Sequence, residues 1–240
     1  MELIEKSDNQ ITFKEKVDES LINAIRRYVS EILVLGIDDV EIFKNDSALY
    51  DETVAHRIGL IPLKMDKGIS EKSEVELKLV SNEEGEVLSK KLKGGAEVVY
   101  ENIPITILNK GQEIEILAKA RLGKGSEHSK FSPGSIFYRN VAEITMDKKF
   151  LEEVKKICSD GKIKSKGDKI IIVDDEKKGI CDVCEGICEA EGEKAETDFK
   201  EELIITIESF GQLETKEIFD KSIKELKKDL DEAVKKIEKA

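Results

Sequence analysis

Residues 208–230 read ESFGQLETKEIFDKSIKELKKDL, which predicts a turn at Gly211 and then a long helix toward the end of the chain. Its apolar residues are four, three, four, three and four positions apart, close to the seam of a coiled coil. They are Phe219, Ile223, Leu226, Leu230, Ala233 and Ile237. About 25 helical residues span roughly 37 Å, more than a small domain usually covers. An amphipathic helix lying on its own domain is the alternative, but the length favours a partner protein.

A second amphipathic helix is predicted near the start of the chain. Asp18 and Ser20 are candidates for its N-cap, and Gly36 is expected to end it before a strand begins near Val40. A strand-like alternation precedes it in residues 4–17. Its apolar stripe consists of Leu21, Ile22, Ile25, Tyr28, Val29, Ile32 and Leu33. The stripe is wide enough to bury one face of the helix.

The composition narrows the possible functions. A net charge of -12 over 240 residues argues against a general DNA-binding surface, because phosphate neutralisation supplies most non-specific affinity. Aromatic residues make up 5% and Trp is absent, so no surface for stacking single-stranded bases is expected. No run of eighteen apolar residues and no signal-peptide pattern occurs, which predicts a cytoplasmic protein without membrane contact. Four cysteines in a chain of this length do not form a secreted disulfide framework.

The middle of the chain predicts antiparallel sheet. Apolar residues alternate in residues 75–79, 103–107 and 114–116, with turn signals at Gly94–Gly95 and Lys110–Gly111. A polar stretch from Cys158 to Lys200 interrupts this pattern and contains one apolar strand, residues 170–173. This stretch is expected to be a small inserted module outside the main core, and a further strand and the long helix follow it.

Two motifs stand apart from simple packing. Residues 23–27 read NAIRR, with Arg26 and Arg27 beside the apolar stripe, where a solvated pair of arginines is the ordinary interpretation. Residues 51–63 read DETVAHRIGLIPL and contain Asp51, Glu52 and His56 as acid–base candidates. No Ser or Cys nucleophile lies beside them, and HExxH spacing is absent. A structural role at a subunit boundary is therefore expected.

The loop at residues 122–133, LGKGSEHSKFSP, is not a phosphate-binding loop, because Gly125 follows Lys124 where Ser or Thr is required. Residues 23–63 and 208–230 together resemble the D subunit of archaeal RNA polymerase, a relative of the bacterial alpha subunit's N-terminal domain and of the third-largest subunit of eukaryotic polymerase II. The loop resembles the family pattern GKxHAKWSP, with Ser129 and Phe131 in place of alanine and tryptophan. By resemblance it packs against neighbouring subunits.

The resemblance implies an α+β fold. Residues 1–47 and 199–240 would form a discontinuous helix-and-sheet dimerisation domain, and residues 48–198 an inserted, mostly antiparallel β domain. Residues 158–198 would be a small cysteine-containing insertion within it, ferredoxin-like or degenerate.

The implied function is a non-catalytic assembly subunit of DNA-directed RNA polymerase, a nucleotidyltransferase whose active site lies elsewhere. The chain would pair with the L subunit and carry the second-largest subunit, with small subunits N and P nearby and DNA bound only by the whole enzyme. Arg27 would contact the second-largest subunit, since its planar fork suits carboxylates and carbonyls. The residues expected to bind partners are Leu21, Ile25, Arg27, Tyr28, Ile32, Phe219, Ile223, Leu226 and Leu230.

The cysteine run has a chemistry of its own. Residues 181–188 read CDVCEGIC, and clustered thiolates in a reducing compartment usually bind metal. By resemblance, Cys181, Cys184 and Cys188 would hold an iron–sulfur cluster, with Cys158 as a possible fourth ligand. The spacing differs from the bacterial ferredoxin run, so a degenerate insertion without metal is the alternative. No cofactor is therefore certain.

Two other functions remain open. In one, the protein is an iron–sulfur or other metal-binding redox or regulatory protein, and the cysteine module is its functional part. In the other, it is a homodimeric scaffold like the bacterial alpha subunit, against which the archaeal-type pattern of residues 51–63 argues.

Overall fold

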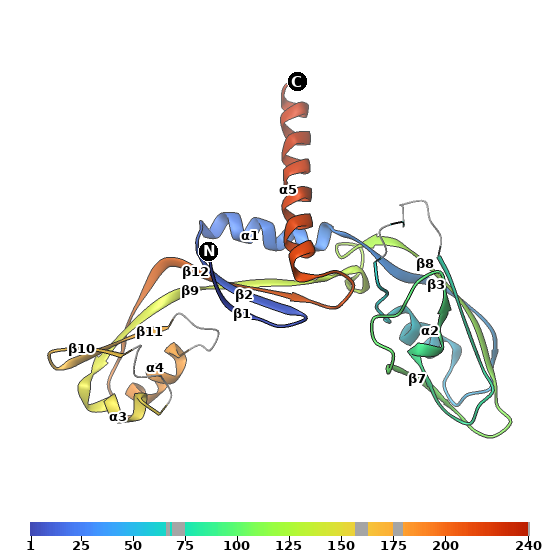
Figure 1. Cartoon of the computed structure of the whole chain (residues 1–240), viewed down its shortest axis with the longest axis horizontal. Helices are drawn as coiled ribbons and strands as arrows, with labels where there is room; N and C mark the ends of the chain where they lie inside the picture. The colour runs from blue at the N-terminus through green and yellow to red at the C-terminus, as the bar shows by residue number, and fades with distance from the viewer. Residues whose placement is uncertain (66–67, 69–74, 157–162, 175–179, 240) are drawn as a thin grey trace. The chain divides into compact units, whose positions relative to one another are not determined.

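The computed structural model describes residues 1–65, 68, 75–156, 163–174 and 180–239. The chain forms two compact units (Figure 1). Unit 1 contains Met1–Ala24 and Ile136–Ile207, and unit 2 contains Ile25–Ser135 and Glu208–Ala240. The α+β class and the mostly antiparallel pairing expected from the sequence are confirmed. The resemblance assigns residues 1–47 and 199–240 to a dimerisation domain and residues 48–198 to an inserted domain. This assignment stays a prediction.

Unit 1 is built on a six-stranded sheet with the order β1-β2-β12-β9-β11-β10. The strands are β1 (Glu2–Lys6), β2 (Gln10–Lys16), β9 (Gly134–Asp147), β10 (Ile163–Lys166), β11 (Lys169–Asp174) and β12 (Glu196–Ser209). Strand β11 pairs antiparallel with β9, and Ile172 lies opposite Ile144. The apolar strand of the polar stretch therefore belongs to this sheet, while the insertion expected for residues 158–198 stays a prediction.

One end of this sheet has its own apolar core. The short helix α3 (Leu151–Val154) follows the 3-10 turn η4 (Lys148–Phe150), and α4 spans Cys181–Ala190. The buried residues that pack together there are Ile144, Met146, Phe150, Val154, Ile170, Ile172, Ile180, Cys184 and Cys188. The buried Asp174 carboxylate accepts hydrogen bonds from Arg139 and from the backbone N–H of Ile180, each at 2.8 Å. This carboxylate ties the start of α4 to the sheet.

Helix α1 (Glu19–Tyr28) leads from unit 1 into unit 2 and is followed by the 3-10 turn η1 (Val29–Glu31). Asp18 accepts hydrogen bonds from the backbone and the hydroxyl of Ser20, which confirms its predicted capping role. The helix ends earlier than predicted. Gly36, expected to end it, lies inside the next strand.

Unit 2 contains a four-stranded antiparallel sheet, β3-β8-β4-β6, and the pair β5–β7. The strands are β3 (Leu33–Asn45), β4 (Val75–Ser81), β5 (Gly85–Leu88), β6 (Lys93–Gly94), β7 (Pro104–Leu108) and β8 (Ile114–Lys124). Helix α2 (Asp51–Gly59) covers the core of the sheet with Val54 and Ile58, both fully buried. The 3-10 turns η2 (Ser89–Lys91) and η3 (Ser129–Phe131) complete the connections, and α5 (Thr215–Ile237) closes the chain.

Phe131 explains why Gly36 lies in a strand. A Cβ atom added at Gly36 or at Gly123 would come within 2.7 Å of the Phe131 ring. The ring is 1% exposed, and the cations of Arg121 and Lys130 lie 5.1 and 5.0 Å from its centre. The two glycines of β3 and β8 thus leave room for the Phe131 ring. The packed ring fixes the loop of residues 124–133 onto the sheet.

We expect Gly123→Ala to destabilise unit 2 by about 1–3 kcal/mol, because the new methyl group overlaps a buried ring between two paired strands. Chemical denaturation followed by circular dichroism measures this change. Gly186→Ala is the control: Gly186 lies in α4 with nothing within 4 Å of the added Cβ, so the exchange should be neutral or slightly stabilising. Equal stability of the Gly123→Ala variant and the parent would show that Phe131 is not seated as described.

Candidate subunit interface

The first half of α5 packs against its own unit. A capping box begins it, in which the backbone N–H of Glu214 donates to Glu217 at 3.3 Å. Thr215, Ile218 and Ser222 are buried, and the Ser222 hydroxyl donates to the carbonyl oxygen of Phe219 at 2.9 Å. In Figure 1, α5 is the red helix, and the end at which it begins lies near η1. The predicted helix is confirmed, although it begins at Thr215.

The second half of α5 is exposed from residue 227 onward. Its apolar side chains Leu230, Val234 and Ile237 are 58%, 53% and 76% exposed. We call the segment Leu230–Ile237 the free arm. At 1.5 Å per residue it is about 12 Å long. The arm presents an apolar strip that the described part of this chain does not cover, which is typical of a surface for another protein.

The predicted partner-binding residues divide into three groups. Ile25 and Ile32 are buried, at 6% and 2% exposure, so they pack within the chain itself. Tyr28, Phe219 and Leu226 are partly buried. The exposed ones are Leu21, Arg27, Ile223 and Leu230. Leu21 lies in unit 1, while the other residues of the set lie in unit 2.

A joint links α5 to the end of α1 and to the loop after β8. The Tyr28 hydroxyl donates a hydrogen bond to Asp229 at 2.9 Å. The ammonium of Lys124 lies 3.1 Å from the Glu31 carboxylate, and the backbone N–H of Ser126 donates to the carbonyl oxygen of Ser30 at 3.1 Å. The hydrogen bond to Asp229 raises the pKa of Tyr28 above its ordinary value.

Sequence reasoning missed three residues of this surface. Val234 lies one turn beyond Leu230, and the strict seam spacing left it out although a four-residue step includes it. Asp229 and Lys124 are charged residues far apart in the sequence, and no local pattern indicates that they share a joint. Only the fold brings them to the same place.

The DETVAHRIGLIPL motif forms α2 and the segment after it. Asp51 accepts a hydrogen bond from Asn45 at 2.8 Å, and the Arg57 guanidinium donates to the carbonyl oxygen of Ile105 at 3.0 Å. His56 lines a groove of about 330 Å³ that His128 and Asp38 also line. Asp38 is engaged by Arg121 at 2.7 Å and by Lys130 at 2.9 Å. The carboxylates of Asp51 and Asp38 therefore make structural contacts, and the predicted role of residues 51–63 at a subunit boundary stays a prediction.

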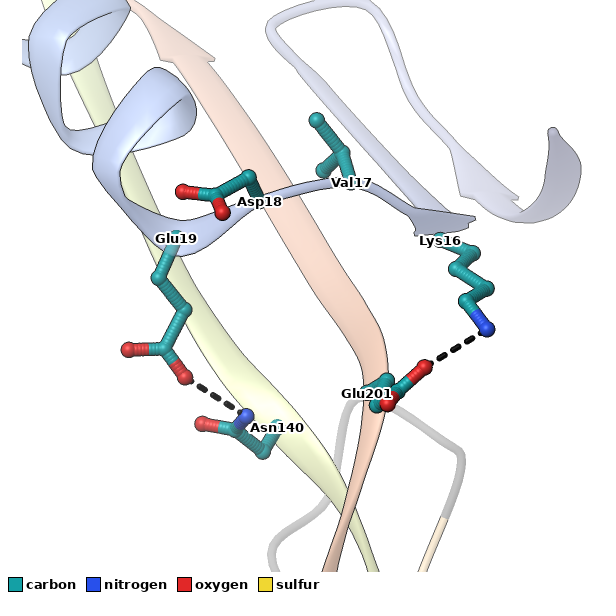
Figure 2. A pocket seen from close by; sticks show the side chains of 6 residues that line it. All are labelled: Lys16, Val17, Asp18, Glu19, Asn140 and Glu201. Atoms are coloured by element: carbon teal, nitrogen blue, oxygen red, sulfur yellow. Dashed lines mark hydrogen bonds and ion pairs between the residues drawn. The ribbon is translucent and has the colours of Figure 1, made fainter.

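A larger pocket lies in unit 1 and has a polar lining (Figure 2). Its volume is about 570 Å³, and it is lined by Lys16, Val17, Asp18, Glu19, Asn140 and Glu201. Figure 2 shows that its polar groups bind one another: Lys16 pairs with Glu201 at 2.6 Å, and Asn140 donates to Glu19 at 2.8 Å. Among the described residues, the lining contains no Ser, Cys or His side chain, and its Lys16 and Glu19 are engaged by Glu201 and Asn140.

Helix α4 carries the cysteines predicted to hold an iron–sulfur cluster. Cys184 and Cys188 are 0% and 1% exposed and lie in the apolar core at the end of the unit 1 sheet. Burial raises the pKa of the Cys188 thiol, which opposes the thiolate that a metal requires. Within the described residues, no three His, Cys, Asp or Glu side chains gather as metal ligands. Cys158 and the side chain of Cys181 lie outside the described residues, and the two described thiols fit packing.

Comparisons with known proteins agree with this architecture. Residues 40–137, a large part of unit 2, match the family model described as the RNA polymerase Rpb3/RpoA insert domain. A DNA-directed RNA polymerase subunit Rpo3 from Methanosphaera stadtmanae is 33% identical over 245 residues, covering 89% of each chain. The Rpo3 of Methanobrevibacter smithii is 30% identical over 98% of this chain and 97% of its own length. That of Methanocaldococcus jannaschii is 39% identical over 56% of this chain and 71% of its own.

None of the helices in the described part of the chain is both long enough and apolar enough to span a bilayer. Two Rpo3 relatives match this chain over nearly their full length, and the insert-domain model matches within residues 40–137. The chain therefore belongs to the Rpo3 family of DNA-directed RNA polymerase subunits.

Proposed function

We propose that this chain is the D-type assembly subunit of an archaeal RNA polymerase. In this role it pairs one-to-one with the smaller L subunit, and the pair forms the platform on which the second-largest subunit assembles. The small subunits N and P bind the same assembly, and DNA is contacted only by the complete enzyme. The proposal includes a cytoplasmic location and a purely architectural contribution to nucleotidyl transfer.

The free arm of α5 is the observation that carries this proposal. Three apolar side chains on consecutive turns are more than half exposed. A partner helix would remove their apolar surface from water, which favours binding. The exposed strip is narrow and follows coiled-coil spacing, so a single helix of matching period is its natural complement. The arm's charged residues lie beside and opposite this strip, which keeps the free chain hydrated.

The cysteine-bearing helix has a structural role in this proposal, whether or not a cluster is bound. Its described thiols lie in unit 1, while the free arm lies in unit 2. Within the described residues, nothing supports the redox or regulatory alternative, because the buried thiols pack in an apolar core.

Pairing is tested by replacing Leu230 with Lys. We expect the change to weaken binding of the L subunit at least tenfold, because it places a charge in an apolar helix contact. Glu232→Gln is the matched control, since it also raises the net charge by one and lies on the opposite side of α5. Isothermal titration calorimetry gives both affinities and the stoichiometry. A parent chain that forms only homodimers, or that ignores the L subunit, would contradict the proposal.

Arg27→Ala is expected to leave the heterodimer intact and to weaken docking of the second-largest subunit. Arg27 is exposed beside the buried stripe of α1, so its fork can reach a second protein. Loss of one partner from a buried charged hydrogen bond costs about 2–5 kcal/mol. Analytical ultracentrifugation of the pair with and without the second-largest subunit separates the two steps. Full assembly with the variant would make Arg27 an ordinary surface residue.

Replacing Cys181, Cys184 and Cys188 with Ser is expected to loosen residues 163–200 and to leave pairing with the L subunit unchanged. Hydrogen exchange measures the first effect and calorimetry the second. The corresponding Ala triple variant separates two causes. Packing alone makes Ser more damaging than Ala, because buried hydroxyls need partners. A structural cluster makes Ser and Ala equally damaging and gives the anaerobically purified parent iron and sulfide. Loss of pairing in either variant would show that the two regions are not independent.

A further inference from the structure

Of the contacts described between α5 and other elements, the Tyr28–Asp229 hydrogen bond lies nearest the C-terminal end of the helix. Asp229 immediately precedes the free arm. The hydroxyl oxygen of Tyr28 and Oδ2 of Asp229 are 2.9 Å apart, and Tyr28 ends α1 while η1 begins at the next residue. The last fixed point of α5 is therefore a single polar contact, placed where the exposed apolar strip begins.

Lys124, at the end of β8, contacts the same region, where α5 meets η1. Its ammonium lies 3.1 Å from Glu31 of η1, and this hydrogen bond, together with the charges of Glu31, Glu225 and Asp229, raises the pKa of Lys124. Lys124 is the last residue of β8 and follows Gly123, which lies under the Phe131 ring. One lysine, held by a rigid strand, thus faces carboxylates from both η1 and α5.

We propose that Tyr28 and Lys124 are positioning residues that set the direction of the free arm before a partner binds. This inference rests on the proposed function, because the arm matters only if it pairs. It also gives the GK pair of the LGKGSEHSKFSP loop a role inside this chain: Gly123 makes room for Phe131, and Lys124 neutralises the joint.

The physical effect is preorganisation. A tilt of 10° at Asp229 displaces the end of an arm of about 12 Å by roughly 2 Å, enough to move knobs out of their holes in a helix pair. A helix held in its binding direction loses less conformational freedom on association, so the complex is tighter without any new contact. Without Lys124, the carboxylates of Glu31, Glu225 and Asp229 would repel one another and push α5 from η1.

The first test is a double-mutant cycle on the affinity for the L subunit. Tyr28→Phe and Asp229→Asn should each weaken binding about three- to tenfold, the worth of one hydrogen bond. The double variant should be no weaker than the weaker single variant, because both remove the same bond. Tyr50→Phe is the matched control, since the Tyr50 side chain is 82% exposed at the start of α2. Additive losses would mean that the two residues act separately and would overturn the inference.

The second test concerns charge at the joint. Lys124→Gln should weaken binding, Lys124→Arg should restore it, and added salt should recover part of the loss in the Gln variant by screening the carboxylates. A direct contact of Lys124 with the partner predicts the opposite response, in which salt weakens the parent and leaves the Gln variant unchanged. That outcome would overturn the assignment of Lys124.

A third measurement needs no partner. In the free chain, Asp229→Asn should lower the pKa of Tyr28, seen as tyrosinate absorbance appearing at lower pH than in the parent. No such shift would show that the bond is absent in solution and would refute the inference. A parent chain that does not bind the L subunit at all refutes the proposed function instead. Normal binding by all variants refutes only the positioning role.

Discussion

The ladder between β3 and β8 is the constraint on which unit 2 depends. It joins residues 33–45 to residues 114–124 and is the most extensive strand pairing of that unit. One end of β3 receives α1 and η1, and the other leads through Asn45 into α2. The corresponding end of β8 leads into the loop seated by Phe131 and supplies Lys124 to the joint with α5. The helix proposed to bind another protein is thereby held in position by a sheet.

Two bulges in this ladder show how the edge strand is used. The register shifts between Ile37 and Asp39 and again between Ile42 and Lys44. Bulges bend an edge strand and make it a poor template for further strands. At the first one, Asp38 turns toward Arg121 and Lys130, the two cations that flank Phe131. The first bulge thus makes β3 less able to pair with a further strand. It also places the Asp38 carboxylate against the two cations beside Phe131.

The sequence predicted what depends on local periodicity. The amphipathic start of α1, the strands of the central sheet, the turn at Gly211 and the helix α5 follow from apolar spacing and turn residues. What it missed depends on contacts between distant segments. Gly36 was expected to end a helix because glycine usually does so there, but its missing side chain makes room for Phe131, ninety-five positions later in the chain. The cysteine spacing indicated ligands, and periodicity alone could not show that Cys184 and Cys188 lie in an apolar core. The exposed seam of α5 could be read from the helical period, and its role in partner binding stays a prediction; the contacts of Asp229 and Lys124 could not be read from the sequence.

The exposed arm of α5 has a consequence for how long the chain survives in the cell. A strip of leucine, valine and isoleucine presented to water is what chaperones and proteases recognise on unfinished proteins, although here it belongs to a folded one. Under the proposed pairing, a copy synthesised without its partner would carry this signal for as long as it remained alone, and pairing would remove it. The abundance of the chain would then follow the abundance of whatever covers the arm, so that balanced subunit numbers would result from degradation of orphans without any regulation of synthesis.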